Sequence, residues 1–109
     1  MNFEEFQAWL SDRFNHNNEL SFQTLGGRSQ VHVRYDPRIG FMTVKRSTGN
    51  EGKLREDKIR RVFERYREGF PGERHMTSFY CDPKWPDTPD RVLAPYIAAV
   101  IKAWAGEVQ

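Results

Sequence analysis

Cysteine is almost absent from this chain of 109 residues, since Cys81 is the only one. A single cysteine cannot close an intramolecular disulfide, and it cannot form a Cys-x-x-Cys metal knuckle. The three histidines, His16, His32 and His75, do not have the spacing of metal ligands either. We therefore expect no disulfide framework and no metal site.

Long apolar runs are also lacking. No stretch of about twenty apolar residues occurs, so the sequence predicts no membrane span. The first residues, MNFEEFQAWL, are acidic and amphipathic, which does not fit a signal peptide. We expect a soluble, cytoplasmic protein with no membrane partner.

Catalytic motifs are missing as well, because no phosphate-binding loop, GxGxxG or GxSxG sequence occurs. Cys81, His75 and Asp82 supply the residue types of a thiol nucleophile, but nothing in the sequence fixes their geometry. The segment 56–58 resembles the E-x-K half of a metal-dependent nuclease motif, yet that motif belongs on a strand and here it opens a helix. The sequence thus assigns no catalytic residue and no cofactor, and an enzyme is the least favoured class.

The chain does contain enough apolar and aromatic material for a core. Hydrophobic residues make up 38% of it and aromatic residues 14%, which argues against disorder. The length suits one domain, and neither an internal repeat nor a low-complexity tract is present. We predict a single α+β domain over residues 1–109.

The longest periodic segment runs from residue 53 to residue 70 and predicts an amphipathic helix over Arg55–Glu68. Its apolar residues recur every three or four positions and share one helical face: Ile59, Val62, Phe63, Tyr66 and Phe70. Gly69 is well placed to end this helix.

Two other helices are predicted. The first carries Phe3, Phe6, Trp9 and Leu10 on one face, and Asn2 with Glu5 has the spacing of a capping box. The last helix begins at Pro95. Its apolar stripe consists of Ile97, Val100, Ile101 and Trp104.

Three short strands are expected between the first two helices. Leu20 and Phe22 alternate with polar residues, the segment 30–35 alternates strictly, and a third strand covers 41–46. Residues 48–52 form a predicted polar loop, and the segment 75–81 is a candidate for a further extended segment. The predicted architecture is helix, three-stranded antiparallel sheet, helix, irregular proline and aromatic loop, helix, with the helices on one face of the sheet.

Positive charge is concentrated in the middle of the chain. Residues 26–67 carry a net charge of about +7 and the remainder about −5, which can produce a polarised surface. On a nucleic-acid or anion-binding hypothesis, the basic residues of the sheet and the central helix would contact phosphates: Arg28, Arg34, Lys45, Arg46, Lys58, Arg61 and Arg65.

A plainer interpretation of the central helix is an ion-paired surface. Its carboxylates, Glu56, Asp57, Glu64 and Glu68, are spaced to pair with its own basic residues at i+3 and i+4. Similarly, the polar face of Gln30, His32 and Arg34 suits either single-stranded bases or simple exposure to water. Whether Phe41 or Tyr35 shares that face is open.

The segment 79–96, rich in proline and aromatic residues, is the second candidate region. It can pack over the core as a lid, line a ligand pocket or form an interface for self-association. The residues that would serve a pocket or interface are Tyr80, Trp85, Arg91 and Tyr96.

Three features together resemble a known group of proteins: the strand GRSQVHVRY, a glycine-bearing turn before a basic helix, and the terminal PYIAAVI helix. The group consists of small uncharacterised bacterial proteins of mobile elements, of the integron gene cassette type. The likeness covers roughly Ser21 to Trp104. It implies an accessory protein of a mobile element, and it transfers no functional residue to this chain.

The sequence therefore favours a small binding module over an enzyme. The first hypothesis is a nucleic-acid or other anionic partner on the basic surface. The alternative is a protein-interaction or homodimer module that uses the loop 79–96.

Overall fold

The computed structural model describes residues 2–14, 19–45, 51–85 and 92–108. Four helices and four strands are assigned there, in the order α1, β1 to β4, α2, α3, α4. The strands are β1 (Leu20–Gln23), β2 (Gln30–Asp36), β3 (Phe41–Lys45) and β4 (Glu51–Leu54). The helices are α1 (Phe3–Arg13), α2 (Glu56–Glu68), α3 (Thr77–Tyr80) and α4 (Ala94–Val108).

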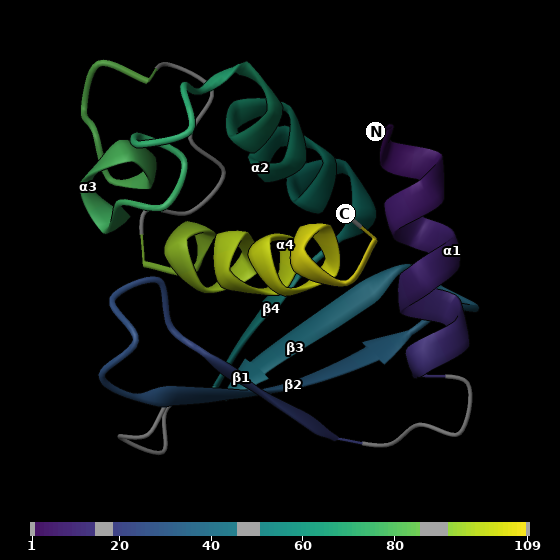
Figure 1. Ribbon diagram of the computed structural model, residues 1–109. Helices are drawn as coiled ribbons and strands as arrows, with labels where there is room; N and C mark the ends of the chain where they lie inside the picture. The colour runs from purple at the N-terminus through teal and green to yellow at the C-terminus, as the bar shows by residue number, and fades with distance from the viewer. Residues whose placement is uncertain (1, 15–18, 46–50, 86–91, 109) are drawn as a thin grey trace.

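The elements form two layers (Figure 1). The four strands build one antiparallel sheet in the order β1-β2-β3-β4. The helices α1, α2 and α4 lie on the same side of this sheet, with α2 packed against α4. The other face of the sheet carries no helix in the described part of the chain. The α+β class is therefore as predicted, and the sheet has one covered and one open face.

The fourth strand corrects the prediction of a three-stranded sheet. β4 pairs antiparallel with β3, and Met42 lies opposite Leu54. The sequence Glu51-Gly52-Lys53-Leu54 has little strand propensity, so its first two residues were expected in a polar loop and its last two in the helical segment 53–70. Pairing and the burial of Leu54, which is 1% exposed, stabilise it as an edge strand.

A second correction concerns the segment 75–81, which is not extended. It contains the short helix α3, with Met76 as its N-cap residue. The helix buries Tyr80 fully, and the Tyr80 hydroxyl donates a hydrogen bond to the carbonyl of Arg74 at 2.6 Å. That contact ties the turn after α2 to the core.

The three long helices agree with the apolar periodicities. The Asn2 side chain accepts a hydrogen bond from the Glu5 amide at 2.8 Å, as the capping-box spacing predicts. Phe70 is the exception, because α2 ends at Glu68 with Gly69 as its C-cap residue, and the Phe70 side chain is 75% exposed. Gly69 has extended backbone rather than a left-handed cap, and a Cβ there would approach Phe79 to 2.7 Å.

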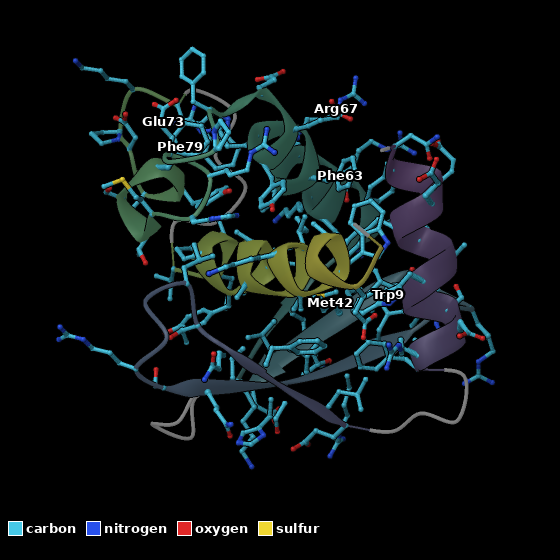
Figure 2. All side chains as sticks on the ribbon, in the orientation of Figure 1. Trp9, Met42, Phe63, Arg67, Glu73 and Phe79 are labelled. Atoms are coloured by element: carbon cyan, nitrogen blue, oxygen red, sulfur yellow. The ribbon has the colours of Figure 1, made fainter. Side chains whose placement is uncertain are left out.

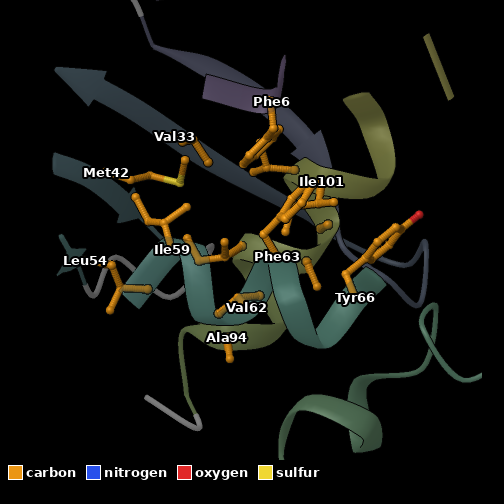
Figure 3. Packing of buried hydrophobic residues seen from close by; sticks show 14 of the residues in the cluster. Phe6, Val33, Met42, Leu54, Ile59, Val62, Phe63, Tyr66, Ala94 and Ile101 are labelled. Atoms are coloured by element: carbon orange, nitrogen blue, oxygen red, sulfur yellow. The ribbon is translucent and has the colours of Figure 1, made fainter. Parts of the chain in front are cut away.

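The core fills the space between the covered face of the sheet and the helices (Figure 3). Aromatic rings join the helices there: Phe6 lies 5.7 Å from Phe63 and 5.3 Å from Trp104, between ring centroids. Full burial of a side chain of this size contributes roughly 1.5–3 kcal/mol. The core residues on β2 and β3 are Val31, Val33, Tyr35, Met42 and Val44.

The charged residues of α2 contact α1 as well as one another. Arg60 lies 3.9 Å from Glu4 of α1 and stacks over Phe3, and Glu56 accepts a hydrogen bond from Gln7. Within α2 the described pair is Arg67 with Glu64, at 4.0 Å. The contacts of Arg60 and Glu56 with α1 fix α1 against α2.

Candidate functional site

The open face of the sheet presents the alternate residues of four strands to solvent. Because the residues at 31, 33 and 35 are buried, their neighbours at 30, 32, 34 and 36 point the other way. The antiparallel register brings in the outward residues of β1, β3 and β4. Figure 2 shows side chains leaving the sheet on the side away from the helices. We call this surface the open face.

One row of the open face crosses three strands. Arg34 of β2 lies opposite Thr43 of β3, and Thr43 lies opposite Lys53 of β4. Neighbouring strands are about 4.8 Å apart, so two cations stand roughly 10 Å apart with a hydroxyl between them. Arg34 also lies 3.4 Å from Glu19, and its side chain remains 61% exposed.

Beside this row the open face is hollowed into a groove of about 320 Å³. Both charged residues of the row line it, together with an aromatic ring and an exposed aliphatic side chain. The lining residues are Arg34, Asp36, Ile39, Phe41, Thr43 and Lys53. Phe41 therefore shares a face with Arg34, whereas Tyr35 is buried on the other side. This settles the point that the sequence left open.

The groove is positive on balance. Its neighbourhood includes Lys45 on β3, Arg38 in the β2–β3 turn, and Arg55, whose guanidinium lies 5.5 Å from the centre of the Phe41 ring. Lys45 stands opposite Glu51, which offsets part of its charge. Lys53 makes no ion pair with any residue in the described ranges, so its charge is free to attract an anion.

Asp36 ends β2 and begins the turn into β3. Its Oδ1 accepts a hydrogen bond from the Arg38 amide at 3.0 Å, which is an Asx turn. Gly40 closes the turn with a φ of 68° and donates its N–H to the Asp36 carbonyl at 2.9 Å. The hydrogen bonds from the Arg38 side chain and amide lower the pKa of Asp36, so this carboxylate is charged at neutral pH.

The remaining cations named from the sequence do not join the open face. Lys58 and Arg61 are exposed on α2, which lies on the opposite side of the molecule from the open face (Figure 1). Arg28 is exposed in the β1–β2 turn, and Arg46 lies outside the described residues. The sheet and helix cations thus form two separate surfaces.

Arg65 is used inside the protein. Its guanidinium stacks 3.8 Å from the centre of the Phe79 ring and 5.0 Å from that of Trp85. Its Nε and Nη2 donate to the Phe79 carbonyl at 3.1 and 2.8 Å. Figure 2 shows Phe79 between α2 and α3. Arg65 therefore anchors the segment 79–85 to α2 and is a poor phosphate ligand.

The aromatic residues of the segment 79–96 are also largely internal. Tyr80 is fully buried and Trp85 is 8% exposed, as a lid over the core requires. Burial and the neighbouring Tyr66 raise the pKa of Tyr80 far above its ordinary value, so its hydroxyl stays protonated. Tyr96 is half-buried in the first turn of α4, and Arg91 lies outside the described residues.

Sequence reasoning missed half of the groove. Asp36 was expected as a turn residue and considered as the upstream acid of the E-x-K motif, and Lys53 was assigned to the helical segment because β4 was not recognised. Thr43 carries no charge and gave no signal. The alternation across 41–45 places Phe41 and Thr43 on one face, and the pairing of β3 with β4 adds Lys53 to that face.

Comparisons with known proteins add no identification, since no family model, curated protein or solved structure matches the chain significantly. Among the residues that the structure describes, no group of three or more histidine, cysteine, aspartate or glutamate residues is arranged to hold a metal ion. In the same residues no helix has the length and apolar character needed to cross a membrane.

Proposed function

We propose that the protein binds single-stranded nucleic acid on the open face of its sheet. The observation that carries this proposal is the convergence of Arg34, Lys53 and Phe41 on one groove. Cations attract the phosphate backbone, and an aromatic side chain offers a surface on which a base stacks.

The shape of the open face favours a single strand over a duplex. In duplex DNA the bases are stacked on one another, and base edges are read in the major groove by an inserted helix or ribbon. The open face presents no helix, so it would reach only the backbone of a duplex. A strand with unstacked bases can use Phe41 as well as the cations.

Charge reversal at matched sites tests the proposal. Lys53→Glu on the open face is compared with Lys58→Glu on α2, since both lysines are exposed. Binding of a labelled single-stranded oligonucleotide is followed by fluorescence anisotropy at low salt. We expect Lys53→Glu to weaken binding about tenfold, or roughly 1.4 kcal/mol, and Lys58→Glu to change it little.

Two results would overturn the proposal. The first is the absence of binding by the unaltered protein at low salt, where phosphate contacts are strongest. The second is an equal loss of affinity in both variants, which would mean that general charge rather than the groove attracts the ligand. Circular dichroism of each variant verifies that it is folded.

Self-association is the second candidate, now supported by a different surface from the one the sequence indicated. Phe70 and Met76 are 75% and 55% exposed in the turn that joins α2 to α3. A second copy of the chain that covered both would remove apolar surface from water. Light scattering should then show a dimer that Phe70→Ser converts to a monomer. A monomer at high concentration would rule this candidate out.

An accessory role in a mobile element, which the resemblance implies, is compatible with nucleic-acid binding. It is part of the proposal and adds no residue to the site.

A further inference from the structure

We infer that Asp36 and Phe41 form a base-binding subsite that prefers guanine. The inference rests on the proposed function and assigns a role to the acidic end of the groove. The Asp36 carboxylate supports the β2–β3 turn and also faces the groove.

The two residues are direct cross-strand neighbours. Asp36 at the end of β2 lies opposite Phe41 at the start of β3, and both line the groove. Side chains opposite each other in an antiparallel pair have Cβ atoms about 5 Å apart. A base stacked on the Phe41 ring would therefore place one of its edges beside the Asp36 carboxylate.

The Asp36 carboxylate has hydrogen-bonding capacity to spare. Oδ1 accepts from the Arg38 amide at 3.0 Å and from Arg38 Nε at 3.3 Å. Within the described residues, the contact of Oδ2 is the one with Arg38 Nη2 at 3.4 Å. An ionised carboxylate offers about four acceptor sites. The Arg38 side chain is 84% exposed, so it can swing away while its amide keeps the carboxylate oriented.

The chemistry of the base edges then decides the preference. Guanine carries two adjacent N–H donors, at N1 and N2, that match the two oxygens of a carboxylate. Cytosine and adenine present one exocyclic amino group, and thymine and uracil present one N–H between two carbonyls that repel the carboxylate. A good bidentate contact of this type discriminates by about 1–3 kcal/mol, which is tenfold or more in affinity.

The cations occupy the other end of the groove. Arg34 and Lys53 flank Thr43 in the row next to Phe41. A nucleotide stacked on Phe41 would therefore direct its phosphate toward these two cations. A free guanine nucleotide and a guanine within a strand share this chemistry. The experiment therefore includes both.

In the strand arm, labelled oligothymidylates that carry dG, dA, dC or dT at one central position are titrated by anisotropy. We expect the dG strand to bind about tenfold more tightly than the dT strand. In Asp36→Asn the ratio of the dG affinity to the dT affinity should fall to about one, because Asn keeps the turn but presents an N–H₂ to the guanine N–H groups.

In the competition arm, guanosine monophosphate and uridine monophosphate are added to the complex with the dT strand. Selective displacement by the guanine nucleotide supports the subsite and shows that free nucleotide is bound. Displacement by neither, with a dG preference in the strand arm, supports the subsite within a strand.

Equal affinity for all four strands and equal competition by both nucleotides would overturn the guanine subsite and leave the proposed function intact. A dG preference that survives Asp36→Asn would also overturn it. Failure to bind any strand would instead remove the proposed function.

Discussion

At the scale of single residues, the partners of a side chain decide what a cation does. Arg65 and Lys53 both belong to the basic middle of the chain, yet Arg65 is enclosed by two aromatic rings and a carbonyl. Lys53 stands in a groove beside Phe41. Arginine suits the first role because its planar guanidinium stacks on rings and donates several hydrogen bonds together.

The Arg65 contacts predict a stability effect. Arg65→Met keeps much of the aliphatic stem but loses the stacking and both hydrogen bonds to the Phe79 carbonyl. We expect the free energy of unfolding to fall by about 2 kcal/mol, measured by urea denaturation.

Arg61→Met is the matched control, because Arg61 is exposed on the same helix. Surface substitutions of this kind usually change stability by less than about 0.5 kcal/mol. Equal effects of the two variants would show that Arg65 does not anchor the segment 79–85.

At the scale of elements, the segment between α2 and α3 is held by polar contacts rather than by a regular structure. Arg74 stacks over Tyr66 and donates to the carbonyls of Gly69 and Arg67. The Tyr66 hydroxyl lies 3.2 Å from His75 Nε2. These contacts make the segment sensitive to the charge of His75.

The stability of the protein should therefore depend on pH. Burial lowers the pKa of His75, and the positive charges of Lys102 and Arg74 lower it further. The unfolded chain therefore binds a proton at His75 more readily than the folded protein does. This contribution to the free energy of unfolding is fully present above the ordinary histidine pKa of about 6.5. It is lost as the pH falls through the pKa of His75 in the folded protein.

We expect the free energy of unfolding to decrease from pH 7 to pH 5 more in the unaltered protein than in His75→Gln. Glutamine can still accept a hydrogen bond from Tyr66 but does not titrate. Urea denaturation at both pH values measures the difference, and an identical decrease in the two proteins would contradict the role of His75.

The elements also show how much of the fold the sequence could predict. The helices α1, α2 and α4 follow from apolar periodicity and capping, and β2 and β3 from strict alternation. β4 could not be predicted, because Gly52 and two charged residues hide it. It forms through pairing with β3, where Leu93 packs so closely against Gly52 that a Cβ there would approach it to 2.5 Å.

The site was predictable only in part for the same reason. Arg34 and Lys45 were named because the strands that carry them are regular. The strand register brings Phe41, Thr43 and Lys53 to one face of the sheet. This register is set by pairing between strands and cannot be predicted from the local sequence. The expected union of sheet and helix cations failed because α2 lies across the molecule from the open face.

At the scale of the whole molecule, the distribution of charge follows the two layers. Acidic residues outside the basic middle pair with cations at the edges: Glu4 with Arg60, Glu19 with Arg34, and Glu107 with Arg13. Among the described residues that line the groove, Lys53 is the cation without an ion pair. One face of the sheet is thus left with an excess of positive charge beside an aromatic ring, which is the basis of the proposed function.

Nuclear magnetic resonance of the labelled protein during titration with a single-stranded oligonucleotide tests this proposal most directly. We expect amide shifts to change at Arg34, Thr43 and Lys53 on the open face, and to stay constant at Lys58 and Arg61 on α2. Shifts confined to α2, or none at low salt, would contradict nucleic-acid binding by the open face.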